Sequence, residues 1–88
     1  MRNYRKVQVL EFLYNGGAYS WYVSWEVAIA CDLSITNASE LLRRYHRQGL
    51  LARHRNQAVP KGFWYQITDA GYRRLIYLQG LFELEGTD

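Results

Sequence analysis

The sequence is poor in the residues that mark exported, disulfide-stabilised or metal-binding proteins. Its 88 residues include one cysteine, Cys31, and two histidines. A single cysteine excludes an intrachain disulfide, and the cysteine and histidines do not match any zinc-site spacing. No apolar run approaches the ~20 residues of a membrane-spanning helix. We therefore expect a cytoplasmic protein with no metal or other cofactor and no membrane association.

Motifs for catalysis are missing as well. The sequence contains no Gly-rich phosphate loop, no nucleophile with a base at a known spacing, and no carboxylate pair of obvious role. A chain of 88 residues is long enough for one modest hydrophobic core but not for two. We expect a single domain over residues 1–88 that is not an enzyme.

Acidic residues are absent from a long central stretch. The net charge is only +3, yet no Asp or Glu occurs between Leu41 and Thr68. Six basic residues lie in that stretch: Arg43, Arg44, Arg47, Arg53, Arg55 and Lys61. Such asymmetry favours a positive surface with nucleic acid as its partner. A solvated basic face without any partner is the alternative that charge alone leaves open.

Apolar periodicity and turn residues predict a mainly α-helical fold with a small β-hairpin, an α+β arrangement. The expected order is helix, short strand, two helices, two hairpin strands and helix, or α-β-α-α-β-β-α. The first helix and the short strand are expected at about residues 3–14 and 18–23. The two middle helices, the hairpin and the last helix are expected at about residues 24–49, 50–68 and 69–80.

Local signals predict where these helices begin and end. Asn-Gly-Gly at 15–17 is expected to end the first helix, because glycine readily takes the left-handed conformation. Ser24 is the expected N-cap of the second helix, and Ser34 or Thr36 that of the third. Gly80 is expected to end the last helix.

The third helix is predicted to have two different faces. Its apolar residues at helical spacing are expected to face the core, with Ile35 near their start: Ala38, Leu41, Leu42 and Tyr45. The positions that point away from this stripe or lie on its flank are Thr36, Asn37, Glu40, Arg43, Arg44 and Arg47. The arginines are therefore expected on the outward face.

Three stretches of the chain resemble the winged helix-turn-helix of small MarR-type and PadR-type transcription regulators. EVAIACDLS at 26–34 is similar to the start of the family's helix-turn-helix. QGLL at 48–51 is similar to the end of its recognition helix, and YQITDAG at 65–71 to its strand-to-helix junction. The resemblance covers roughly residues 4–78.

Two features depart from the family pattern. Asp32 stands at a turn position that is often glycine, although aspartate tolerates the left-handed conformation. Ile29 and Ala30 occupy positions that are usually charged and solvated. We expect residues 18–23 or a partner subunit to cover them.

The resemblance implies binding to double-stranded DNA, with the third helix in the major groove and the hairpin as a wing along the backbone. Candidates for contacts to base edges or nearby phosphates are Thr36, Asn37, Glu40, Arg43 and Arg44. Candidates for contacts to phosphates alone are Arg47, Arg53, Arg55 and Lys61. The resemblance also implies a homodimer, because such regulators are usually two-fold symmetric.

Apolar residues near the C-terminus predict where two copies meet. The residues beyond what a small domain easily buries are Leu78, Leu81, Phe82 and Leu84. With the first helix, this C-terminal segment is the expected dimer surface. In the last helix, Tyr72, Leu75 and Ile76 are expected to face inward.

Other side chains have plainer interpretations. We expect Cys31 to be a small buried hydrophobe rather than a redox sensor. The aromatic cluster Tyr19, Trp21, Tyr22 and Trp25 is expected to pack in the core or an interface, with an effector pocket as the alternative.

The main prediction is a sequence-specific DNA-binding regulator. The alternatives are a winged-helix module for protein–protein contact, which would not need an acid-free stretch, and a non-specific, chromatin-like nucleic-acid-binding protein.

Overall fold

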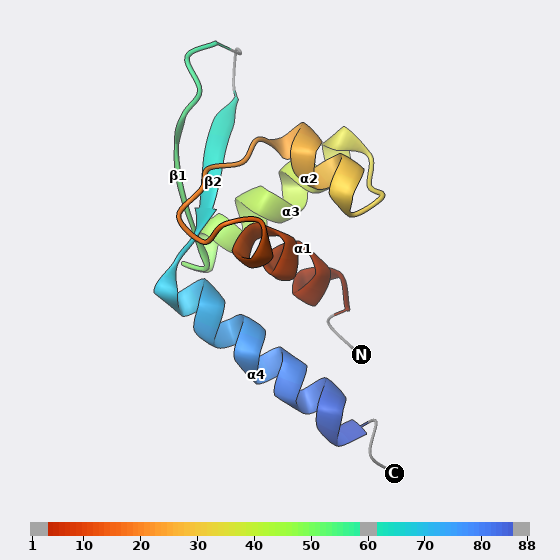
Figure 1. Cartoon of the computed structure of the whole chain (residues 1–88). Helices are drawn as coiled ribbons and strands as arrows, with labels where there is room; N and C mark the ends of the chain where they lie inside the picture. The colour runs from red at the N-terminus through yellow and green to blue at the C-terminus, as the bar shows by residue number, and fades with distance from the viewer. Residues whose placement is uncertain (1–3, 59–61, 86–88) are drawn as a thin grey trace.

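The computed structural model describes residues 4–58 and 62–85, which form four helices and a two-stranded antiparallel sheet. The helices are α1 (Tyr4–Asn15), α2 (Ser24–Ala30), α3 (Ile35–Arg47) and α4 (Asp69–Glu85), and the strands are β1 (Leu51–Arg55) and β2 (Phe63–Ile67). α1 lies between α2 and α4 and contacts both, while the hairpin stands to one side of the helices (Figure 1). The order of the elements is that of a winged helix.

The strand expected at 18–23 is reduced to a single bridge. Tyr22 pairs with Tyr65 of β2, and each backbone N–H donates to the other residue's carbonyl oxygen at 2.8 Å. The pairing does not continue, because α2 begins two residues later. The Tyr22 ring instead packs 5.1 Å from that of Phe12, centroid to centroid. The prediction of a separate strand was therefore wrong, and the bridge attaches this segment to the sheet.

The helix-turn-helix begins with two different kinds of cap. Ser34 is the N-cap of α3, as predicted, and its Oγ accepts a hydrogen bond from the Asn37 N–H at 3.0 Å. Ser24, in contrast, is not the N-cap of α2 but its first residue, and Val23 is the cap. The Glu26 carboxylate reaches back and accepts from the Val23 N–H at 2.9 Å. A carboxylate in the first turn thus replaces the expected hydroxyl.

The turn between α2 and α3 has the expected left-handed residue. Asp32 has a φ of 55°, and Cys31 beside it is 1% exposed, which confirms Cys31 as a core residue. Ile29 is 74% exposed and Ala30 is also exposed. Residues 18–23 therefore do not cover them, because that segment is attached to β2 through Tyr22 rather than laid over α2.

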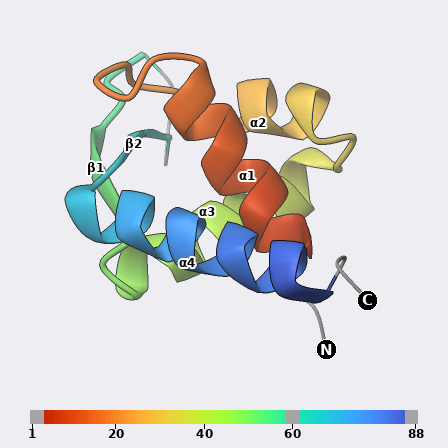
Figure 2. The same cartoon turned by 60° about the horizontal axis from the view of Figure 1, so that its bottom comes forward.

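α4 is longer than predicted and buries a different face. It continues through Gly80, expected as its end, and is 17 residues long. Leu75 is buried, as expected, and Leu78, which was expected on the dimer surface, is buried too. The side chains of Phe82 and Leu84 lie outside the described residues. Tyr72 and Ile76, expected to face inward, are 39% and 48% exposed. The reason is that α4 packs along one side only, against α1 and β2 (Figure 2). None of the helices in the described residues is long and apolar enough to cross a membrane.

A junction of hydrogen bonds fixes the end of α3 to the base of the hairpin and the start of α4. Gly49 takes a left-handed φ of 79° after α3. The Thr68 hydroxyl donates to the Gly49 carbonyl at 2.8 Å and accepts from the Gly71 N–H at 3.0 Å. The Thr68 N–H donates to the Leu50 carbonyl at 3.0 Å. These bonds hold the hairpin at a defined position relative to α3.

Candidate nucleic-acid interface

α3 separates its residues into the two predicted faces. Ala38, Leu42 and Tyr45 are buried, and Leu41 is half-buried. Ile35, expected near the start of this stripe, is instead 61% exposed. The residues predicted to point outward are all exposed: Thr36, Asn37, Glu40, Arg43, Arg44 and Arg47. The structure thus brings six of the predicted site residues onto one helical surface.

The arginines of this surface are not neutralised by acidic neighbours. Arg43, Arg44 and Arg47 line a hollow of about 240 Å³ together with Glu40. None of them forms an ion pair within the described part of the chain, even with this carboxylate. The outer face of α3 is therefore a positively charged surface whose donors are free to bind another molecule.

α1 contributes a basic residue that the sequence did not assign to this surface. Arg5 lines a second hollow with Asn37, Glu40 and Arg44. Its guanidinium Nη1 also donates to the Cys31 carbonyl at 3.0 Å, which holds the side chain beside the helix-turn-helix. No local pattern could have revealed this neighbour, because the contact depends on how α1 packs against α2.

Lys6 is a second basic residue of α1 near α3. Its Nζ donates to the Gln48 Oε1 at 3.0 Å and lies 5.3 Å from the centroid of the Tyr45 ring. Burial lowers the pKa of Lys6, and the positive charges of Arg74 and Arg44 lower it further. The main cause is thus the burial of the ammonium group, and Arg74 and Arg44 add a smaller effect of positive charge.

The hairpin directs alternate residues of β1 to opposite sides. Arg53 pairs with Tyr65 in the strand register, and its guanidinium carbon lies 4.1 Å from the centroid of the Phe63 ring. His54 points the other way, and its ring lies 4.4 Å from that of Trp21 in an edge-on arrangement. Arg53 therefore lies with Phe63 and Tyr65 on the side of the hairpin toward α3, and His54 lies with Trp21 on the other side.

Two candidates of the hairpin remain, Arg55 and Lys61. Arg55 is exposed at the end of β1, opposite Phe63. Lys61 lies outside the described residues, so its predicted contact stays a prediction.

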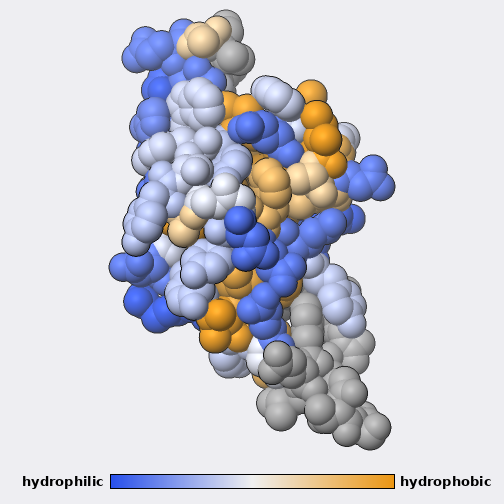
Figure 3. Space-filling model, in the orientation of Figure 1, coloured by the Kyte–Doolittle hydropathy of each residue, from blue (hydrophilic) through white to orange (hydrophobic). Residues whose placement is uncertain are grey.

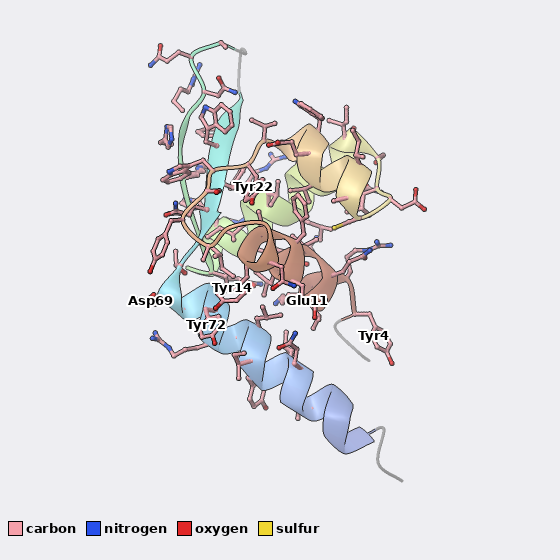
Figure 4. The ribbon with its side chains drawn as sticks, in the orientation of Figure 1. Tyr4, Glu11, Tyr14, Tyr22, Asp69 and Tyr72 are labelled. Atoms are coloured by element: carbon pink, nitrogen blue, oxygen red, sulfur yellow. The ribbon has the colours of Figure 1, made fainter. Side chains whose placement is uncertain are left out.

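A cluster of tyrosines lies where α1 ends and α4 begins. The rings of Tyr14 and Tyr72 stack with their centroids 4.6 Å apart (Figure 4). Together with Tyr19 and Asp69 they line a shallow hollow of about 240 Å³. Tyr19 is 92% exposed, so the aromatic segment is only partly in the core.

The His, Cys, Asp and Glu side chains of the described residues are dispersed rather than clustered. No group of three His, Cys, Asp or Glu side chains there is placed to hold a metal ion. Burial raises the pKa of the Cys31 thiol, although the positive charge of Arg5 acts in the opposite direction. A raised pKa keeps the thiol protonated and poorly nucleophilic near neutral pH.

No family model matches this chain, and no curated protein matches it in sequence. Solved structures do match. A variant of MepR from S. aureus bound to an oligodeoxyribonucleotide is 21% identical, with a TM-score of 0.76 over 96% of this chain and 61% of that chain. A MarR family protein from Bacillus stearothermophilus is 19% identical, with a TM-score of 0.73 over 94% and 55% of the two chains.

A third match is a homodimeric winged helix-turn-helix DNA-binding domain from Mycobacterium bovis, described as a possible ArsR-family transcriptional regulator. It is 24% identical, with a TM-score of 0.65 over 98% of this chain and 73% of that chain. The present chain spans 61% of the MepR variant and 55% of the Bacillus protein. These similarities confirm the prediction from sequence: the chain has a winged helix-turn-helix fold that resembles MarR-type regulators.

Proposed function

We propose that this protein binds double-stranded DNA as a sequence-specific transcription regulator. α3 enters the major groove, and the β1–β2 hairpin lies along the backbone as a wing. The observation that carries the proposal is the outer face of α3. Arg43, Arg44 and Arg47 are exposed there without an ion pair in the described residues, while the opposite face of the helix is buried. A binding function of this kind requires no catalytic group.

The residues of the proposed interface divide by their chemistry. Asn37 and Arg44 suit base edges, because Asn bonds adenine and Arg bonds guanine at two atoms each. Thr36 and Glu40 lie on the same surface and complete the proposed base-reading set. Arg43 lies toward the wing, where base edges and backbone are both close.

Contacts to the backbone position the protein without reading sequence. We assign this role to Arg47 at the end of α3 and to the basic residues of the wing, which are Arg53, Arg55 and Lys61. Arg5 joins this set, because α1 places it beside Asn37 and Arg44.

We propose further that two copies associate through α4 and α1. The exposed apolar residues of α4 recur at intervals of four, one and four positions: Tyr72, Ile76, Tyr77 and Leu81. Tyr14 of α1 stacks on Tyr72 and extends this surface. Apolar surface is also visible over this helix in Figure 3. A second copy that covered this stripe would remove it from water and would present two α3 helices to symmetric half-sites.

The proposal is tested by selecting duplexes from a random library and measuring their affinity as a function of salt. We expect one motif to be enriched and its affinity to fall steeply, with a slope of ~0.9 per phosphate contact in a double-logarithmic plot. The Arg43→Ala/Arg47→Ala variant is expected to lose selective binding. Arg74→Ala, which removes a charge from the side of α4 near Lys6 of α1, serves as the control and is expected to retain it.

Other outcomes would favour the other functions. Tight binding without enrichment of a motif would support a non-specific, chromatin-like protein. No binding even at low salt would support a module for protein–protein contact, with an acidic partner on the arginine face.

A further inference from the structure

A surface hollow of about 300 Å³ lies between α3 and the hairpin. The residues that line it come from four elements: Ser24, Ser39, Arg43, Arg53, Phe63 and Tyr65. Two guanidinium groups thus face one space, and no carboxylate of the described residues lines it. Neither arginine has a hydrogen bond or an ion pair in the described part of the chain. A pair of unneutralised cations converging from separate elements is a site for an anion.

Arg53 is held in place on the hairpin side of this hollow. Its guanidinium carbon lies 4.1 Å from the centroid of the Phe63 ring, a cation–π distance. The side chain is half-buried, so it has fewer rotamers to lose when it binds an anion. This contact uses no hydrogen bond of the guanidinium, so its N–H groups stay available as donors.

Arg43 and two hydroxyl groups complete the helix side. Ser39 precedes Arg43 by four residues and therefore lies on the same side of α3, one turn earlier. Ser24, the first residue of α2, adds a second hydroxyl. Both serines are half-buried, and neither side chain forms a hydrogen bond in the described residues. The hollow therefore offers two charged and two neutral donors.

We propose that this hollow is a seat for one phosphate group, held by Arg43 and Arg53 together. A phosphate oxyanion has the charge and the several acceptor oxygens that two guanidinium forks and two hydroxyls can satisfy. The inference rests on the proposed DNA-binding function: the phosphate is a backbone linkage of the duplex that lies between α3 and the wing. Free inorganic phosphate shares this chemistry and is the second source that the test separates.

Binding of one phosphate by both arginines affects how the protein recognises DNA. A phosphate bound by both arginines joins α3 to the hairpin, so the wing and the helix are fixed on one backbone position. Arg43 then sets the register of α3 in the groove, and the reading of bases is left to Asn37, Glu40 and Arg44. The contributions of Arg43 and Arg53 to affinity are coupled rather than additive.

The first test uses a series of selected duplexes, each with one backbone linkage replaced by a neutral methylphosphonate. With the natural protein, we expect one linkage per bound copy to weaken binding by about 10- to 100-fold, because charge-assisted hydrogen bonds are lost. In Arg43→Ala and in Arg53→Ala, neutralising that same linkage is expected to cause little further loss. Arg47→Ala should stay sensitive there, and Arg74→Ala should match the natural protein.

The second test needs no DNA. Inorganic phosphate is titrated into the protein while the Nε–Hε signals of the arginines are followed by NMR. We expect the signals of Arg43 and Arg53 to shift together, with one apparent Kd, at lower phosphate concentration than those of Arg47 and Arg73. In Arg53→Ala the shift of Arg43 should weaken, because half of the seat is gone.

The results separate the seat from the wider proposal. The seat is refuted if Arg43→Ala and Arg53→Ala become insensitive at different linkages, or if phosphate shifts all arginine signals alike. Duplex binding would survive either result. Conversely, the protein could bind no duplex while inorganic phosphate shifts the Arg43 and Arg53 signals together. That result would support the phosphate site and refute the DNA-binding proposal.

Discussion

Glu40 is the one acidic residue of α3, and it lies at the centre of its basic face. It shares one hollow with Arg43, Arg44 and Arg47 and another with Arg5, yet it forms no ion pair in the described residues. A carboxylate in this place repels phosphates and accepts a hydrogen bond from few base edges, chiefly the amino group of cytosine. Its presence therefore favours selectivity over affinity.

We expect Glu40→Gln to bind DNA more tightly in general but to discriminate less at one base pair. The lost discrimination corresponds to roughly 1–3 kcal/mol, or about 5- to 150-fold in relative affinity. Folding should be nearly unaffected, because the side chain is exposed. The measurement compares the Kd for the selected duplex with that for a scrambled one at fixed salt. Equal tightening for both duplexes would show that Glu40 repels the backbone and reads no base.

Deprotonation of the buried Cys31 thiol is expected to destabilise the fold at alkaline pH. Burial raises the pKa of its thiol above the ordinary 9.0, so the unfolded chain loses the proton at lower pH than the folded chain does. The thiol's contribution to stability is thus complete below about pH 9 and is lost as the pH rises through the folded pKa. Burial also raises the pKa of Tyr45 above 10.0, which acts in the same direction at still higher pH.

We therefore expect the free energy of unfolding to fall as the pH rises above about 9, and to fall less in Cys31→Ala. That variant should be less stable at neutral pH, because it leaves a small cavity, but its pH profile should be flatter. Guanidinium unfolding followed by tryptophan fluorescence gives both quantities. Parallel profiles for the two proteins would rule out the thiol as the titrating group.

At the scale of elements, the close approach of α4 to the end of α3 depends on one glycine. A Cβ at Gly71 would overlap the carbonyl oxygen of Leu50 and lie 2.8 Å from the Ile67 Cγ1. The first of these neighbours is backbone and cannot move without breaking the junction at Thr68. Gly80, in the same helix, would place a Cβ in open space, with nothing within 4 Å.

Replacement by alanine should change the stability of the fold in opposite directions at Gly71 and Gly80. Gly71→Ala is expected to destabilise the fold by roughly 1–3 kcal/mol, because the overlap outweighs the better helix propensity of alanine. Gly80→Ala is expected to stabilise it by up to about 1 kcal/mol, because alanine loses less backbone entropy than glycine. Denaturant unfolding of both variants is the measurement. Stabilisation by Gly71→Ala would contradict the packing described for this junction.

The sequence predicted those features that a local pattern of residues determines. It did not predict those that depend on contacts between elements. The two faces of α3 and the left-handed Asp32 follow from spacing and residue type, and both were predicted. The inward face of α4 was predicted correctly only for Leu75, because helical spacing places Tyr72 and Ile76 beside it but does not show how much of the helix α1 and β2 cover. The place of Arg5 in the candidate site was missed for a similar reason: it depends on the packing of α1.

At the scale of the molecule, two surfaces with exposed apolar residues are candidates for contact with a second copy. One is the stripe of α4 proposed as the dimer surface, and the other is α2, where Trp25 and Ile29 are 56% and 74% exposed. Figure 3 shows apolar surface over both regions. Contiguous apolar surface of this kind marks an interaction site. Both helices carry it, but the stripe on α4 is longer and is extended by the stacked Tyr14.

We therefore expect the protein to dimerise through α4, and Ile76→Glu to shift it to monomers. The reason is that a charge in the middle of the stripe would have to be buried without a partner. Ile29→Glu makes the same change on α2 and serves as the matched control, which should stay dimeric. Sedimentation equilibrium over a range of protein concentrations measures both variants, and circular dichroism verifies that each is folded. Dissociation by Ile29→Glu but not by Ile76→Glu would place the dimer on α2, beside the DNA-binding face. The two α3 helices would then not be presented to symmetric half-sites by an α4 interface, and the proposed mode of dimeric binding would have to be abandoned.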